Sequence, residues 1–322
     1  MLLLKAIRLL LFLFAAIITS QVHAGPFPPA PGIRYDIGGY SIHMLCRGQG
    51  QPTVIIDAGL GEDSSDWFEI QNRSSVETRV CVFDRPGYGW SDTGPQPRHS
   101  LQIARELETL LQKAHIQGPY VLVGHSFGGY NVRIFAARNP NKVAGMVLVD
   151  ASHENQYEKL DIKLPRYYQR TGNILILPKH VNADSSFSKP SVLLEKAIHA
   201  ARAEISSLYD SAMLVRQYET IPKVPLIVIS RGRAGWTDRK DAVSREKIWM
   251  TLQYDLWKLS PISQQIFAKQ SGHNIHLDQP DLVVSAINDV VIMSRVMCTT
   301  PQTGYTVSLL QSTVNDHSVC GQ

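Results

Sequence analysis

Short apolar runs alternate with amphipathic segments along most of the chain. The runs are bounded by turn-forming residues and predict strands at residues 34–37, 40–46, 53–57, 80–83, 120–123, 144–149, 225–230 and 265–269. From Thr53 onward many of them are apolar on both faces, as in the buried strands of a parallel sheet. Between Ser100 and His115 the apolar residues follow helical spacing, and Ser100 is placed to cap the helix. Strands that alternate with such helices predict a layered α/β fold.

Residues 155–222 break this alternation, because they contain no predicted strand. A Pro-, Ser- and Asn-containing stretch near residues 178–192 precedes a long segment with apolar residues at helical spacing. We interpret the region as an inserted helical cap above the carboxyl ends of the strands, where open α/β sheets bind ligands. The predicted organisation is a core of residues 33–154 and 223–297, the cap of residues 155–222, and a polar C-terminal tail of residues 298–322.

The first 24 residues have the pattern of a cleaved secretory signal peptide. Lys5 and Arg8 precede an apolar run over residues 9–18, and small residues flank a cleavage point after Ala24. The run is too short for a membrane span. We therefore expect an exported chain, periplasmic or secreted, with no stable membrane span after cleavage. A segment that is not cleaved would instead leave an N-terminal anchor.

Charge argues against some classes of partner. The chain has 32 basic and 28 acidic residues, and loss of the signal peptide removes two basic residues and no acidic one. A nearly neutral protein is a poor match for nucleic acid and has no polybasic membrane patch. The oligomeric state stays open.

Four cysteines remain after signal cleavage: Cys46, Cys81, Cys298 and Cys320. An even number in an exported chain indicates two disulfides, for which three pairings exist. None of the cysteines has the spacing of a zinc site, and the stretch "HENQY" at residues 153–157 lacks the second histidine of a zinc helix. The sequence therefore predicts no metal site.

The stretch "VLVGHSFGGY" places Ser126 between Gly124 and Gly128, directly after a predicted strand and before a predicted helix. A turn this tight brings main chains close together and leaves the side chain at its apex projecting from the sheet. This G-x-S-x-G pattern is typical of a nucleophile elbow. A glycine-rich entry into an ordinary helix is the alternative.

A serine hydroxyl becomes nucleophilic when a base removes its proton, and a histidine held by a carboxylate is the usual base. His273 lies in "QSGHNIHLDQP" just beyond the last predicted strand, and it follows the serine in chain order. We therefore predict His273 as the base. We interpret His125 and His43 as packing residues.

The oxyanion of a tetrahedral intermediate needs backbone amides directed at it. One should be the amide of Phe127, immediately after the nucleophile. The other should be the amide of Leu60, because Gly59 and Gly61 allow the chain to bend there.

Four motifs in this order, "DAGLG", "FDRPGYGWSD", "GHSFGG" and "SGHNIHLDQP", resemble the α/β-hydrolase superfamily over roughly residues 33–297. Within it they are similar to the esterase, lipase and proline-iminopeptidase-like branch with a helical cap. The resemblance implies an α/β-hydrolase fold: an eight-stranded, mostly parallel sheet flanked by helices, with a Ser, acid, His triad in that chain order. No cofactor is implied.

The resemblance leaves the triad acid open. The acid usually follows the strand after the cap, but residues 233–235 at that position are Arg-Ala-Gly. Asp150, at the end of the preceding strand, is the predicted acid, because some lipases of the superfamily use that position. Asp238 is the alternative, and Glu154 is a third candidate. His153 is interpreted as a substrate contact or part of a turn.

The resemblance also implies that the strands of Cys46 and Cys81 are neighbours, which makes a Cys46–Cys81 disulfide reasonable. For Cys298 and Cys320 the argument is different. A polar tail such as residues 298–322 would fray unless it were tied down, and a disulfide between these two cysteines would tie it down.

The predicted function is an exported serine hydrolase that acts on a small-molecule ester or lipid through an acyl-enzyme on Ser126. The alternative is an amidase or aminopeptidase, in which acidic cap residues such as Glu195, Glu204 or Asp210 would hold the substrate amine. A third possibility is a non-catalytic binding module on the same fold.

Overall fold

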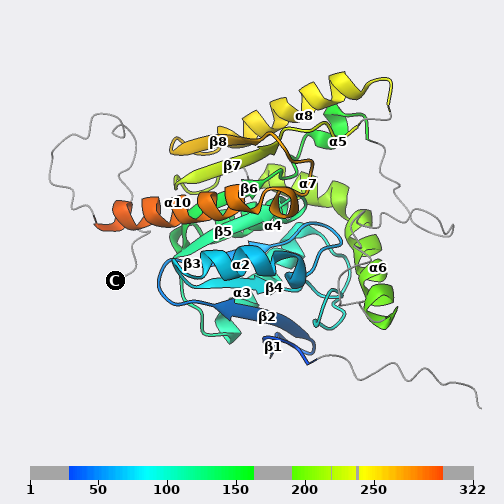
Figure 1. The fold of residues 1–322 in the computed structure, drawn as a ribbon. Coiled ribbons are helices and arrows are strands. Elements are labelled where there is room, and N and C mark those ends of the chain that lie inside the picture. Colours follow the sequence, from blue (N-terminus) through cyan, green and yellow to red (C-terminus); the bar gives the residue numbers. More distant parts are fainter. Residues whose placement is uncertain (1–28, 163–190, 219, 237–238, 300–322) are drawn as a thin grey trace, which may run out of the picture.

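The computed structural model describes residues 29–162, 191–218, 220–236 and 239–299, and its centre is one eight-stranded sheet (Figure 1). The strand order is β1-β2-β4-β3-β5-β6-β7-β8. β1 and β2 pair antiparallel to their neighbours, and all other pairs are parallel. The bounds are β1 Ile33–Asp36, β2 Ser41–Arg47, β3 Thr53–Asp57, β4 Val80–Phe83, β5 Tyr120–His125, β6 Val143–Val149, β7 Leu226–Arg231 and β8 Ser263–Ala268. The prediction of eight strands in a mostly parallel sheet is confirmed.

Helices cover both faces of this sheet. In Figure 1, α2 and α10 cross one face and α3 and α4 lie on the other. The helices are α2 Phe68–Ser74, α3 Ser100–Lys113, α4 Gly128–Arg138, α5 Gln156–Lys159, α6 Ser191–Ser206, α7 Leu208–Gln217, α8 Ala242–Trp257, α9 Ile275–Asp278 and α10 Pro280–Thr299, with 3-10 turns η1 Ser64–Trp67 and η2 Pro140–Lys142.

The central strands supply two apolar cores, one on each face. In β5, Leu122 packs in the core that contains the side chains of α3 and α4, while Val121 and Val123 pack in the core that contains those of α2 and α10. The same alternation recurs in β3, β6 and β7, and every residue of these strands is buried. Full burial of one such aliphatic side chain contributes about 1.5–3 kcal/mol. These strands are therefore apolar on both faces because both faces are covered.

The cap of helix α3 differs from the prediction. Ser100 is the first helical residue, and the N-cap is His99, whose Nδ1 accepts a hydrogen bond from the Gln102 amide at 3.1 Å. The Ser100 amide donates instead to Ser211 Oγ at 3.0 Å. An unprotonated imidazole nitrogen can accept like a cap oxygen, so the prediction from the usual cap residues was one position late.

The described part of residues 155–222 contains α5, α6 and α7 and no strand. Helix α6 packs against the loop that follows β4: Lys196 Nζ donates to the carbonyls of Gly89 and Ser91 at 2.9 and 2.6 Å. Because that loop leaves the carboxyl end of β4, α6 lies beside the carboxyl ends of the parallel strands. The division of the chain into a core and a cap remains an interpretation.

A disulfide joins Cys46 of β2 to Cys81 of β4, which face each other in the antiparallel register. This confirms the first predicted pairing. The proposed Cys298–Cys320 pair is not tested, because Cys320 lies outside the described residues, as does the proposed signal peptide of residues 1–24.

Loss of this disulfide should destabilise the fold. It links residues 35 positions apart, and closing a loop of that length constrains the unfolded chain by about 3–4 kcal/mol. We expect Cys46→Ala to lower the free energy of unfolding by that amount in urea titrations without reductant. Equal unfolding midpoints for the variant and the wild type would contradict this.

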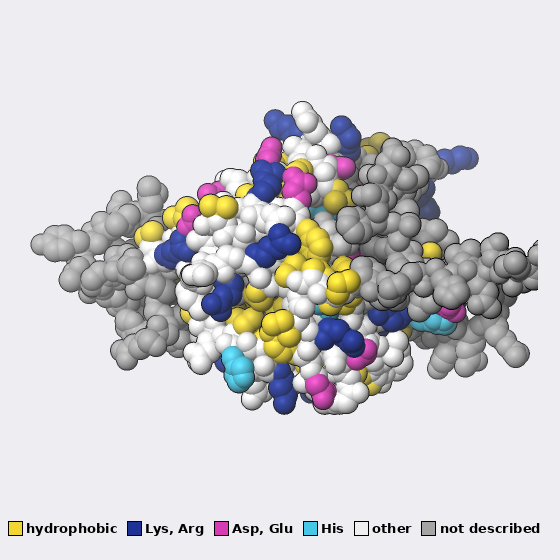
Figure 2. Space-filling model, turned by 60° about the horizontal axis from the view of Figure 1, so that its bottom comes forward, with side chains coloured by type: hydrophobic (Ala, Val, Ile, Leu, Met, Phe, Trp, Pro, Cys, Tyr) yellow, Lys and Arg dark blue, Asp and Glu magenta, His cyan; other side chains and the backbone are white. Residues whose placement is uncertain are grey.

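None of the described helices combines the length and apolar content that a membrane span requires. The face shown in Figure 2 carries scattered Lys, Arg, Asp and Glu side chains, with hydrophobic side chains gathered between them. No single sign of charge dominates that face, in keeping with the nearly neutral sequence.

Candidate active site

Ser126 occupies a sharp turn between β5 and α4. Its φ of +50° is in the left-handed region, which is costly for a residue other than glycine. The glycines on either side allow the close approach. A Cβ at Gly124 would meet Val132 Cγ2 at 2.7 Å, and one at Gly128 would meet the Asp57 carbonyl oxygen at 2.2 Å. The turn therefore has the geometry of a nucleophile elbow, as the sequence predicts.

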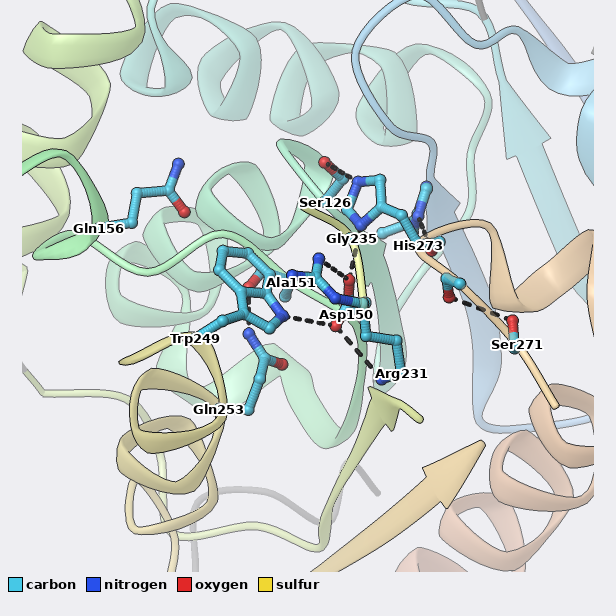
Figure 3. A network of polar contacts seen from close by, with 12 residues as sticks. Ser126, Asp150, Ala151, Gln156, Arg231, Gly235, Trp249, Gln253, Ser271 and His273 are labelled. Carbon is cyan, nitrogen blue, oxygen red and sulfur yellow. Dashed lines mark hydrogen bonds and ion pairs between the residues drawn. The ribbon is translucent and has the colours of Figure 1, made fainter. Parts of the chain in front are cut away.

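Three predicted residues meet at the carboxyl edge of the sheet. Ser126 follows β5, Asp150 follows β6, and His273 lies in the loop after β8. His273 Nε2 is 2.9 Å from Ser126 Oγ, and His273 Nδ1 is 2.6 Å from Asp150 Oδ2 (Figure 3). Asp150 is fully buried, while the imidazole of His273 is 40% exposed. The serine, imidazole and carboxylate thus form one continuous chain of hydrogen bonds that opens to solvent at the histidine.

The surroundings of Asp150 keep it ionised. Trp249 Nε1 donates to its Oδ1 at 2.8 Å, and Arg231 Nη1 donates to its Oδ2 at 3.2 Å (Figure 3). Burial alone raises the pKa of Asp150, but the hydrogen bond and charge of His273, together with the Arg231 guanidinium, hold the pKa below its ordinary value. A carboxylate held this way fixes the orientation of the His273 ring.

The other candidate acids are not in this network. Glu154 forms an ion pair with Arg133 at 2.7 Å, and Asp238 lies outside the described residues. Arg231 is the last residue of β7, two residues before the Arg233-Ala234-Gly235 stretch where the resemblance places the usual acid. Its guanidinium donates a hydrogen bond to Asp150. The end of β7 therefore supplies a cation that pairs with the predicted acid, and β6 supplies the acid.

The loop after β3 lies beside the elbow, because β3 and β5 are paired and Asp57 is opposite Gly124. It contains Leu60, the second predicted oxyanion donor. Neither the Leu60 nor the Phe127 amide donates to a backbone carbonyl of another described residue outside the regular elements. Neither amide is therefore committed to one of these backbone carbonyls.

Glu62, His125 and His276 form a buried cluster beside His273, with ligand atoms within 4.8 Å of one another. Two imidazoles and a carboxylate can hold a divalent ion. Glu62 Oε1 lies 2.8 Å from His125 Nδ1 and 3.8 Å from His276 Nε2, and neither ring nitrogen of the buried His276 makes a hydrogen bond. Burial lowers the pKa of His276 to about 3 and keeps it neutral, and its ring stacks on Trp67 with centroids 4.4 Å apart.

His125 also contacts the loop that contains His273. Its Nε2 donates to the His273 carbonyl at 3.0 Å, so His125 supports this loop in addition to packing in the core.

His153 should make stability depend on pH. Burial lowers its pKa to about 4 from an ordinary 6.5, so between these values the unfolded chain binds more protons and stability falls as the pH falls. We expect His153→Asn, which keeps an acceptor for the Asn155 amide, to flatten this dependence by up to ~1.4 kcal/mol per pH unit in urea unfolding. Parallel pH profiles for variant and wild type would contradict this.

A cavity of about 400 Å³ lies elsewhere, between the end of α3 and the start of β5, and is lined in part by His115, Tyr120 and Lys142. It is at the amino end of β5, whereas Ser126 follows the carboxyl end. This cavity therefore does not serve the candidate site.

Sequence reasoning missed four side chains that support the site: Arg231, Trp249, Glu62 and Arg85. Trp249 lies on α8, 99 residues from Asp150, and no local pattern links the two. Arg85 is part of the "FDRPGYGWSD" motif, so its position was marked but its contacts were not.

Comparisons with known proteins agree with this fold. Residues 52–200 match the sequence model of a family described as "alpha/beta hydrolase fold". The uncharacterised protein YqjL of Bacillus subtilis (strain 168) is 28% identical over 257 residues, which span 80% of this chain and 90% of YqjL.

Solved structures are similar in fold at low sequence identity. The enol-lactonase from Burkholderia xenovorans LB400 is 18% identical with a TM-score of 0.56, covering 81% of this chain and 100% of the lactonase. A thermophilic esterase from Thermogutta terrifontis is 19% identical with a TM-score of 0.54, covering 81% of this chain and 98% of the esterase. Together with the family match over residues 52–200 and the strand order, these likenesses lead to one conclusion: the chain has the α/β-hydrolase fold.

Proposed function

We propose that this α/β hydrolase is a serine hydrolase that cleaves carboxylic esters through an acyl-enzyme on Ser126. The observation that carries the proposal is the pair of contacts at His273: 2.9 Å to Ser126 Oγ and 2.6 Å to Asp150 Oδ2. Because a buried carboxylate holds one ring nitrogen, the other is directed at the serine as a proton acceptor.

The reaction follows from these positions. His273 Nε2 takes the proton of Ser126 Oγ as the oxygen attacks the ester carbonyl, and the oxyanion that forms is bound by the amides of Leu60 and Phe127. His273 then gives the proton to the leaving alcohol. A water molecule, activated by the same nitrogen, releases the acid and restores the serine. These steps need no cofactor.

An ester is favoured over a free-amine substrate by the fate of the cap carboxylates. Glu204 is fully buried and binds the Arg85 guanidinium through both oxygens, at 2.7 and 3.1 Å. Its Oε2 also accepts from the Tyr88 hydroxyl at 2.8 Å, so this buried carboxylate already serves contacts within the protein. Glu195 and Asp210 are exposed on the outside of α6 and α7. An aminopeptidase would need a carboxylate directed into the site, and these three carboxylates do not supply one.

We propose that the protein acts outside the cytoplasm. The N-terminal pattern of Lys5, Arg8 and the apolar run supports this, and so does the Cys46–Cys81 disulfide, because such bonds persist in oxidising compartments. Among the described residues, no unpaired buried cation lies beside Ser126. A small uncharged ester or a lipid ester is the substrate class that suits such a site.

The substrate class can be tested on the purified mature protein. We expect turnover of p-nitrophenyl esters of graded acyl length and far slower release of p-nitroaniline from a prolyl p-nitroanilide with a free amine. The preferred acyl length would also report the size of the pocket. Faster cleavage of the amide would favour the aminopeptidase alternative, and failure to cleave any ester would contradict the proposed function.

A further inference from the structure

Arg85 is a buried arginine with every donor used, and its partners link the helix α6 to the loop that contains Leu60. Nε and Nη2 donate to Glu204 of α6 at 2.7 and 3.1 Å. Nη1 donates to Asp57 Oδ1 at 2.8 Å and to the Ala58 carbonyl at 2.6 Å. The remaining donor of Nη2 reaches the Gly59 carbonyl at 2.8 Å. A guanidinium has five N–H groups in a rigid fork, so none is left over.

The bond to the Gly59 carbonyl sets the direction of the next amide. The carbonyl of Gly59 and the N–H of Leu60 belong to one peptide group, which is planar and is not among the cis bonds of the described chain. In a trans peptide the two groups point in opposite directions. The Gly59 carbonyl also accepts from the Glu62 amide at 3.2 Å, so Arg85 and this turn bond together set where the Leu60 N–H points, and Arg85 supplies the shorter bond at 2.8 Å.

Two further contacts tie Arg85 to the same site. Its guanidinium lies over the ring of Phe127, 5.6 Å from the centroid, and Phe127 supplies the second proposed oxyanion amide. Glu62 Oε2 accepts from the Gly59 amide at 2.7 Å. The peptide groups on either side of Gly59 are thus held by one cation and one carboxylate.

Glu204 holds the fork in this orientation. Its two oxygens take one donor each from Nε and Nη2, and Oε2 also accepts from the Tyr88 hydroxyl at 2.8 Å. Arg85, Asp57 and Glu204 are all buried, so the ion pairs are shielded from water and breaking one is costly. Without the Glu204 carboxylate, the guanidinium is free to turn toward Asp57.

We propose that Arg85 is a positioning residue for the oxyanion hole and that Glu204 of α6 fixes the orientation of its guanidinium. The packing of α6 against the core is thereby coupled to the direction of the Leu60 N–H. The inference deepens the proposed ester hydrolysis and rests on it. Substrate binding does not require the coupling, whereas stabilisation of the oxyanion does.

Glu204→Gln tests the coupling, and Glu106→Gln is its matched control. Glu106 pairs with another buried arginine, Arg98, at 2.5 and 2.8 Å, and neither touches the loop. We expect Glu204→Gln to lower kcat about 10- to 100-fold with little change in KM, because a misdirected donor costs less than the 10²–10³-fold of a lost one. The affinity for a trifluoromethyl ketone, whose adduct carries an oxyanion, should fall by the same factor. Glu106→Gln should change neither value.

Arg85→Lys separates charge from geometry. Lysine keeps the charge but cannot reach both Gly59 and Glu204 in a fork, so we expect kcat to fall at least as far as in Glu204→Gln. Full activity of Arg85→Lys, or equal effects of Glu204→Gln and Glu106→Gln, would overturn the inference.

Tyr88→Phe is the substitute test if Glu204→Gln does not fold. It removes one bond to Glu204 and should lower kcat by a smaller factor than Glu204→Gln. An unchanged kcat would overturn the inference.

Hydrogen exchange separates this inference from the proposed function. We expect faster amide exchange across residues 57–62 in Glu204→Gln than in Glu106→Gln, with or without ester turnover. A wild type that cleaves no ester but shows this difference would contradict the hydrolase proposal and retain the coupling. Unchanged exchange in active protein would overturn the coupling and retain the hydrolase.

Discussion

Ser126→Ala is expected to remove nearly all ester hydrolysis, with a loss of roughly 10⁴- to 10⁶-fold in kcat. The variant deletes the only atom that can form the acyl-enzyme while leaving the turn between β5 and α4 in place. KM should change little, because the hydroxyl contributes little to ground-state binding. The measurement is steady-state hydrolysis of the best p-nitrophenyl ester of the panel.

Ser152→Ala is the matched control for this variant. The Ser152 amide donates to the Ser126 carbonyl at 2.9 Å, so the control serine lies beside the elbow, and the donating group is unaffected by the substitution. We expect wild-type kinetics. Equal turnover by Ser126→Ala and the wild type would show that another group attacks the ester.

Asp150→Asn is expected to lower kcat by about 10⁴-fold, the effect of losing the carboxylate of such a triad. An asparagine amide placed 2.6 Å from His273 Nδ1 would donate to it. The ring proton would then be on Nε2, the nitrogen that faces Ser126. In that tautomer Nε2 could not accept the proton of the serine hydroxyl. Arg231 would keep its bonds to Glu246 at 3.0 and 3.1 Å, which limits the loss of folding stability.

Another Asp–His pair in the described residues, Asp84 with His43, provides a close control. Asp84 Oδ2 is 2.8 Å from His43 Nδ1, and both side chains are fully buried. Asp84→Asn should lower the melting temperature while reducing kcat far less than Asp150→Asn does. If the two variants lost activity equally, the role of Asp150 would be structural.

The sequence predicts much of the fold because the signals are local. Apolar runs locate all eight strands to within a few residues. The signal is strongest in β3 to β7, which are mostly apolar because every residue in them is buried. The elbow is equally readable, because the glycines around Ser126 are imposed by contacts such as that of Gly128 with the Asp57 carbonyl. The position of His273 after the last strand also predicted that its side chain would lie beside Ser126.

The supporting groups could not be read in this way, because they come together only through the strand order. β6 and β7 are neighbours although the whole cap region separates them in sequence, and this adjacency brings Arg231 to Asp150. Glu204 is 119 residues from Arg85 and looked like an ordinary acid on an amphipathic helix. His99 replaced the expected cap Ser100 for a related reason: the contact of Ser100 with Ser211 depends on a helix far along the chain.

The most direct measurement is the site of reaction with a fluorophosphonate probe, located by mass spectrometry of peptides from the wild type, Ser126→Ala and His273→Ala. The account predicts one adduct on Ser126 Oγ in the wild type, none in Ser126→Ala, and much slower labelling in His273→Ala. Labelling of a different residue, or equal labelling of the wild type and Ser126→Ala, would contradict it.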